Sequence, residues 1–166
     1  IVKGVKRAMA GEYSRELSTK VFVGQCRLIE LGYRQGGPAG YGLRRVLVDQ
    51  AGKIKAVLTR GEHKSLQTDR VILMPGPEDE VHHVRDIFRW LIDEDLSIAA
   101  IAVRLNSMGI RTDIGQKWTF SSVRQVLTNE KYIGNNVYNR RSFKLKRLRV
   151  INPPEMWIRR EGAFEG

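Results

Sequence analysis

The sequence predicts an α+β fold that is mainly α, with a long N-terminal helix, a small antiparallel β-sheet and a helical bundle containing an extended helix-turn-helix. Three observations predict this fold. Residues 1–31 contain no proline and repeat apolar side chains every fourth position, strand-like runs follow within residues 43–74, and three amphipathic helical patterns follow within residues 78–129. With 166 residues, 42% of them hydrophobic, the chain is long enough to bury one sizeable core.

The first segment, residues 1–31, is predicted to be one helix that ends at Gly32. Its apolar stripe consists of Val5, Met9, Tyr13, Leu17 and Val21. At 1.5 Å per residue such a helix extends about 46 Å, which is farther than a domain of this size can cover. We therefore expect a linker or dimerisation helix rather than a helix packed along its whole length on its own core. Because Ile1 already lies within the pattern, we also expect a further segment before it.

The next unit, residues 32–79, combines a glycine-rich segment with a small sheet. Residues 32–42 contain five glycines and one proline, which predicts an irregular, tightly turned boundary. Strands with a turn at 49–53 are predicted at residues 43–48, 54–59 and 70–74. Pro75, Gly76 and Pro77 then end the unit.

The helical module is assigned to residues 80–139. Acidic residues at 78–80 favour a helix start, and the first helix is predicted to reach about Glu94. Ser97 can cap a second helix that ends at Gly109, and Thr119 can cap a third over residues 119–129. The connection at 110–118 is longer than the turn of the simplest helix-turn-helix, so we expect a winged or extended version. A strand is predicted at 132–139.

The charge distribution predicts a polyanionic partner, with nucleic acid first. The net charge is +11 and the isoelectric point is about 10.2. Residues 1–50 contain nine basic and four acidic residues, and residues 51–100 contain seven basic and nine acidic ones. Residues 101–166 contain thirteen basic and five acidic residues. The ends of the chain are therefore basic and its middle is not.

The sequence offers no candidate catalytic residue, metal ligand set or cofactor site. Cys26 is the only cysteine, and the three histidines do not combine with it into a zinc cluster. No carboxylate pair or activated nucleophile has useful spacing. No apolar run could span a bilayer and no signal peptide is present, so we expect an intracellular, cytoplasmic protein.

The third helix of the module supplies most candidate DNA contacts. With Val123, Val126 and Leu127 facing inward, its polar residues are Thr119, Ser121, Ser122, Arg124, Gln125 and Thr128. Arginine can recognise guanine and glutamine can recognise adenine in the major groove. Lys117 and Lys131 flank the helix and are placed to bind phosphates. The alternative is an ordinary surface helix with a polar outer face.

Two other regions add candidates. The run 140–149 opens the basic tail, residues 140–166, and Arg140, Arg141, Lys144 and Lys146 could clamp phosphates there. A solvated loop is the alternative. Arg34 in the glycine-rich segment is suited to a minor groove, although a plain turn is an equal alternative there.

Several motifs together resemble the large serine recombinases of phages and mobile elements. They are Met9-Ala10-Gly11-Glu12-Tyr13-Ser14-Arg15-Glu16-Leu17-Ser18, the segment Gly36 to Gly42, the helix Ile98 to Gly109, and Trp118-Thr119 through Tyr132-Ile133-Gly134. They occur in the family order along nearly the whole chain. Gly40 departs from the pattern, because many relatives have proline there.

The resemblance implies the DNA-binding part of such a recombinase, with the helix at 1–31 as its linker and residues 32–166 as its DNA-binding domain. A catalytic domain with the nucleophilic serine would precede Ile1, and a zinc-ribbon domain would follow Gly166. The implied partners are the double-stranded DNA of an attachment-site half and, for the full-length protein, further copies in a dimer or tetramer. A stand-alone helix-turn-helix transcription regulator is the main alternative, and an RNA-binding or structural protein is a third.

Overall fold

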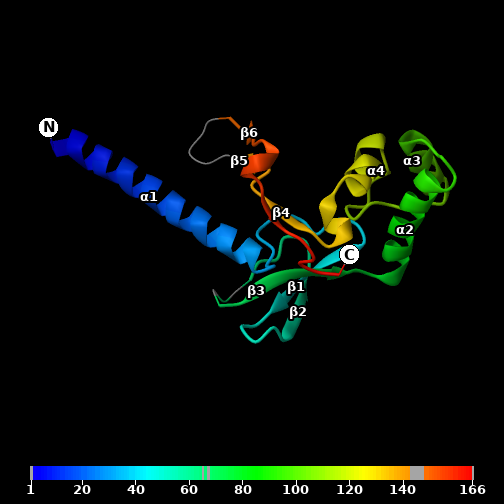
Figure 1. The fold of residues 1–166 in the computed structure, drawn as a ribbon, viewed down its shortest axis with the longest axis horizontal. Helices are drawn as coiled ribbons and strands as arrows, with labels where there is room; N and C mark the ends of the chain where they lie inside the picture. The colour runs from blue at the N-terminus through cyan, green and yellow to red at the C-terminus, as the bar shows by residue number, and fades with distance from the viewer. Residues whose placement is uncertain (1, 65, 67, 143–147, 166) are drawn as a thin grey trace.

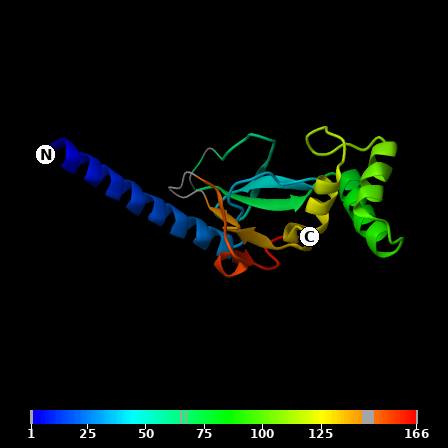
Figure 2. The same ribbon diagram turned by 90° about the horizontal axis from the view of Figure 1, so that it is seen from above.

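The computed structural model describes residues 2–64, 66, 68–142 and 148–165. The molecule is elongated, with α1 (Val2–Glu30) projecting from one end, a three-stranded sheet in the middle and three helices at the other end (Figures 1 and 2). The fold class is α+β and mainly α, as the sequence predicts.

Helix α1 touches the rest of the protein only near its C-terminal end within the described residues. There Ile29 is fully buried, the Phe22 ring lies 6.3 Å from the Tyr138 ring, and the Tyr138 hydroxyl donates to Gln25 Oε1 at 2.6 Å. The predicted apolar stripe is 49–69% exposed at Val5, Met9, Tyr13, Leu17 and Val21. The stripe is therefore not covered by the chain's own core, which agrees with the expectation drawn from its length.

The sheet consists of β1 (Leu43–Val48), β2 (Ile54–Leu58) and β3 (Arg70–Pro75), in the antiparallel order β2-β1-β3. The turn between β1 and β2 forms because Asp49 Oδ1 accepts from the backbone amides of Ala51 and Lys53, both at 2.9 Å. The predicted strands are confirmed to within one residue at each end. The sheet buries side chains on both faces, with Val46 and Val48 on one and Leu47, Leu58 and Leu73 on the other.

The three helices are α2 (Glu78–Ile92), α3 (Ile98–Ser107) and α4 (Phe120–Leu127). The Ser97 side chain accepts from the Ala100 amide, so the predicted cap of α3 is confirmed. Their common core also takes in two aromatic residues from the connections and comprises Tyr41, Ile87, Trp90, Ile101, Ala102, Leu105, Trp118, Val123 and Val126. The helical periodicity identified the buried faces of α3 and α4, but on α2 it placed Ile92, which is 73% exposed, on the buried face and missed the buried Trp90.

The chain after α4 differs from the prediction. Residues 132–139 do not form one strand, because a 3₁₀ turn, η1 (Glu130–Ile133), comes first and only β4 (Asn136–Tyr138) is extended. The Asn129 side chain starts the turn by accepting from the Lys131 amide at 3.3 Å, and Gly134 ends it at φ 82°.

The last segment folds back onto the body. After β5 (Arg141–Ser142), β6 (Val150–Ile151) and η2 (Pro154–Met156), strand β7 (Ile158–Arg160) pairs antiparallel with β4, while β5 pairs with β6. Strands β4 and β7 also form the surface on which the end of α1 rests (Figure 1). The part of residues 140–166 that the structure describes is thus an integral part of the fold.

Candidate nucleic-acid interface

Helix α4 has only eight residues, so its two ends must be stabilised by side chains. At its start, Thr119 Oγ1 accepts from the Ser122 amide at 3.2 Å, and Ser122 Oγ accepts from the Thr119 amide at 2.8 Å. This reciprocal capping box satisfies two backbone donors that the first turn leaves free. Val123 is fully buried and Val126 is 4% exposed, which fixes the helix on the core and directs its opposite face outward.

The loop before α4 is anchored to α3 by one amide side chain. Asn106 Oδ1 accepts from the Trp118 amide at 2.9 Å, and Asn106 Nδ2 donates to the Trp118 carbonyl at 2.8 Å. The Trp118 ring then packs edge-to-face on Tyr41, with 4.9 Å between ring centroids. The long connection therefore holds α3 and α4 in a fixed relation.

The outward face of α4 consists of Ser121, Arg124, Gln125 and Thr128, all exposed. The Thr128 hydroxyl donates to the Arg124 carbonyl at 2.8 Å. Within the described residues, the Arg124 guanidinium, the Gln125 amide and the Ser121 hydroxyl have no hydrogen-bond partner in the protein. Three groups with donors and acceptors are thus available to an external ligand.

The glycine-rich segment lies beside α4 and is held by the stretch that follows this helix. Three of its backbone carbonyls accept hydrogen bonds from side chains: Ala39 from Lys131 Nζ, Tyr41 from the Tyr132 hydroxyl at 2.9 Å, and Tyr33 from Asn136 Nδ2 at 3.1 Å. Burial raises the pKa of Tyr132, which keeps its hydroxyl a donor. The path of the segment is therefore set by residues more than 90 positions away.

Two glycines of this segment are required by close packing. Gly40 has φ 98°, and a Cβ there would lie 2.6 Å from Lys131 Nζ. Gly42 has φ 75°, and a Cβ there would lie 2.8 Å from Val84 Cγ2. Proline needs φ near −65°, so a proline at position 40 could not adopt this backbone conformation.

Three adjoining hollows follow the glycine-rich segment from the sheet to α4. The first, of about 170 Å³, lies beside the sheet and shares Gly36, Gly37 and Arg45 with the second, of about 580 Å³. The second shares Arg60 and Asp113 with the third, of about 200 Å³, which Ser122, Gln125 and Val126 of α4 line. A continuous concave strip therefore runs from the sheet to α4.

Comparison with known families identifies the helical part of the chain. A family model described as Recombinase matches residues 78–166, which is just over half of the sequence and runs from α2 through β7. The chain belongs to the Recombinase family. No curated protein and no solved structure matches it significantly. Membership of this family supports a role related to site-specific DNA recombination.

Two predicted DNA contacts lie against the body of the protein, where Lys131 is buried and Arg34 is half-buried. Arg34 Nη1 donates to Asn136 Oδ1 at 3.2 Å, and burial lowers the pKa of Arg34. Lys131 is 7% exposed, its ammonium lies 5.8 Å from the Tyr132 ring centroid, and burial together with the charge of Arg34 lowers its pKa to about 8. These cations stabilise the glycine-rich segment, and their contact with DNA stays a prediction.

The remaining predicted contacts occupy two further places. Lys117 is exposed just before α4. Arg140 stacks 4.5 Å from the centroid of the Trp157 ring, and Arg141 is exposed on β5. Lys144 and Lys146 lie outside the described residues.

Two residues with a place in the interface escaped the sequence reasoning. Phe120 is the first residue of α4 and is 51% exposed one turn before Arg124. Its position directly after the capping Thr119 could have predicted its exposure, because a large apolar side chain at the first position of this helix does not face the core. Asn136 is fully buried and joins Arg34 to the backbone of Tyr33, which no local pattern indicates.

The described residues contain no group of three or more His, Cys, Asp or Glu side chains that could hold a metal ion. Nor does any helix among them combine the length and apolar character needed to cross a membrane.

Proposed function

We propose that this chain is the DNA-binding segment of a site-specific serine recombinase and that it recognises one half of a duplex attachment site during integration or excision. The observation that carries the proposal is the outward face of α4. On this face, the Arg124 guanidinium and the Gln125 carboxamide have no partner among the described residues. They lie on a capped helix within the region that matches the Recombinase family. Such side chains have the donor and acceptor pattern for bases in the major groove.

In this proposal α3 and α4 act as an extended helix-turn-helix, with α4 in the major groove. Arg124 contacts a guanine, Gln125 contacts an adenine, and the N-terminal end of α4 meets a phosphate together with Lys117. The long connection anchored by Asn106 replaces the tight turn of simpler modules. Phe120 stands beside Arg124 and offers an apolar contact to a thymine methyl group.

Helix α1 serves in the proposal as the linker to a catalytic domain and as a surface for self-association in the full-length protein. Its exposed apolar stripe and its projection away from the body support this role (Figure 1). The catalytic serine belongs to a domain outside this chain. The fragment is therefore expected to bind DNA without cutting it.

The test is a selection from a pool of randomised duplexes with the purified 166-residue chain, followed by affinity measurements on the selected duplex and a scrambled one. We expect an enriched motif containing G and A, tighter binding to the selected duplex, and a steep loss of affinity between 50 and 200 mM salt. Arg85→Gln is the charge-matched control, because Arg85 is exposed on α2 and is not among the predicted DNA contacts. A folded chain that enriches no motif and binds no duplex at low salt contradicts the proposal.

A further inference from the structure

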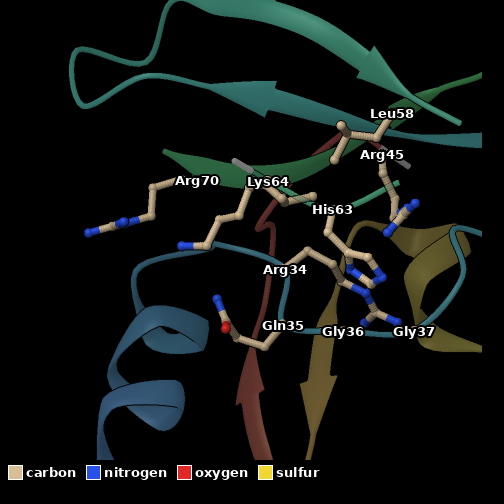
Figure 3. Close-up of a pocket in the computed structure, with 10 residues that line it drawn as sticks. Arg34, Gln35, Gly36, Gly37, Arg45, Leu58, His63, Lys64 and Arg70 are labelled. Carbon is tan, nitrogen blue, oxygen red and sulfur yellow. The ribbon is translucent and has the colours of Figure 1, made fainter. Parts of the chain in front are cut away.

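The hollow of about 170 Å³ beside the sheet has a strongly basic lining. Its ten lining residues include four cationic side chains, one histidine and no acidic residue: Arg34, Gln35, Gly36, Gly37, Arg45, Leu58, His63, Lys64, Arg70 and Val71. Figure 3 shows Arg34, Arg45 and His63 directed toward one another, whereas the Lys64 and Arg70 side chains extend away from them in the opposite direction. The four cations of the lining therefore come from four segments: the glycine-rich segment, β1, the connection between β2 and β3, and β3.

Arg34 is a half-buried cation of this hollow and has no ion-pair partner among the described residues. One of its N–H groups donates to the neutral Asn136 side chain. Its Nε is buried and has no hydrogen-bond partner among the described residues. The nearby buried cation, Lys131, repels it, since the charge of Arg34 contributes to the lowered pKa of Lys131. A buried guanidinium N–H with an unmade hydrogen bond is costly unless an anion completes it.

Backbone carbonyls also hold the other cations of the lining in place. Arg45 Nη2 donates to the carbonyls of Thr59 at 2.6 Å and Glu62 at 2.9 Å. Lys64 Nζ donates to the Asp69 carbonyl at 3.1 Å, to which Arg70 also donates. The Asp69 carboxylate itself pairs with Lys55 at 2.8 Å. These contacts fix the side chains beside the hollow, whose lining includes no acidic residue.

The glycines make this space accessible to a bulky anion. Gly36 and Gly37 are exposed and have φ 64° and 75°. A Cβ on Gly37 would lie 3.3 Å from Arg34 Nη2, so a side chain at this position would crowd the guanidinium. The bare backbone lets a ligand approach it closely.

We infer that this hollow is a phosphate-binding site and that it takes a phosphodiester group of the bound duplex. The inference rests on the proposed function and adds a second, sequence-independent contact to that of α4. The adjoining hollows connect the two places along one concave strip, as described above. Arginine side chains held in a fixed geometry bind phosphate oxygens well, because guanidinium N–H groups match them in pairs.

The test uses the 166-residue chain and the double variant Arg45→Gln/Arg70→Gln, with Lys64→Gln as a milder variant on an exposed loop. Arg85→Gln on α2 is the control that loses one charge outside the hollow. Affinities for the selected and the scrambled duplex are measured across a salt series. We expect the double variant to weaken both duplexes equally and to flatten the slope of log K against log salt by about 1, with unchanged folding. Wild-type affinity and slope in the double variant and in Lys64→Gln would overturn the inference.

A second measurement separates the two sources of phosphate. Inorganic phosphate is titrated into the ¹⁵N-labelled chain, with sodium chloride at equal ionic strength as the control, and the Gly36 and Gly37 amide signals are followed. The phosphate site is supported if phosphate, but not sodium chloride, shifts these signals and if the double variant shows no such shift. If the chain then binds no duplex, the site remains but its assignment to DNA fails together with the proposed function. The absence of such shifts, together with an unchanged salt slope, excludes the site.

Discussion

The outward face of α4 and the basic hollow beside the sheet present cationic groups in two different ways. Arg124 on α4 is exposed, unpartnered and borne by a single helix. Arg34 in the hollow is half-buried, hydrogen-bonded to Asn136 and shares the lining with three other cations. An exposed, adaptable side chain can discriminate between base edges, whereas a half-buried and fixed one suits a group that every duplex presents. The difference indicates a division of labour in which α4 recognises the base sequence of the duplex and the hollow binds its phosphate backbone.

The largest expected effect tests how rigidly the glycine-rich segment is built. Gly42→Ala should lower the free energy of unfolding by about 3–4 kcal/mol, because the left-handed backbone and the overlap with Val84 both oppose a Cβ. Gly36→Ala is the matched control, since its φ is 64° but nothing lies within 4 Å of the added Cβ. It should cost about 1 kcal/mol. Chemical denaturation measures both, and equal losses would contradict the close packing.

The second prediction concerns the buried ammonium of Lys131. Folding lowers the pKa of Lys131 from 10.5 to about 8. Between pH 8 and pH 10.5 the unfolded chain therefore keeps a proton on Lys131 that the folded chain has lost. Because of this difference, the free energy of unfolding rises as the pH increases from 8 to 10.5. Lys131→Met removes this dependence. The stability difference between wild type and variant, from denaturation at pH 7 and pH 10.5, should change by up to about 3 kcal/mol. A constant difference would mean that Lys131 is not desolvated.

A smaller effect sharpens the role of α4. If Phe120 contacts a thymine methyl, replacing that thymine by deoxyuridine in the selected duplex should weaken wild-type binding about fourfold, equivalent to about 0.8 kcal/mol for one buried carbon. Phe120→Ala should bind the two duplexes equally. The measurement is a fluorescence anisotropy titration at constant salt. A deoxyuridine penalty that persists in Phe120→Ala would assign the methyl contact to another residue.

The smallest effect concerns the one acidic residue shared by the second and third hollows, Asp113. Its exposed carboxylate repels a phosphate backbone lying in the strip. Asp113→Asn should therefore tighten binding to any duplex roughly twofold at low salt, as expected for about 0.5 kcal/mol from an exposed charge. Asp93→Asn at the exposed end of α2 is the matched control. An equal gain from both would show a general charge effect instead.

The sequence predicted the elements that local patterns determine. Strand β1 and the caps Ser97 and Thr119 occur where the sequence indicated, because alternation, capping chemistry and helical periodicity are written within a few residues. The 3₁₀ turn after α4 was missed, since apolar residues such as Tyr132 and Ile133 suit a strand equally well.

The candidate site was predictable only in part, for a related reason. The exposed face of α4 followed from the positions of its buried valines. The burial of Arg34 and Lys131 did not, because their partners Asn136 and Ala39 lie 102 and 92 residues away in the sequence. Positive charge in a sequence reveals neither whether a side chain is buried nor whether other cations gather around it.

The most direct test of the division of labour is one set of affinities. Wild type, Arg124→Ala and Arg45→Gln/Arg70→Gln are each titrated with the selected and the scrambled duplex at 150 mM salt. We predict that Arg124→Ala lowers the ratio of the two affinities by roughly tenfold to a hundredfold, as loss of a base contact worth about 1–3 kcal/mol requires. The double variant should lower both affinities and keep their ratio. A ratio that survives Arg124→Ala, or that collapses in the double variant, would contradict the account.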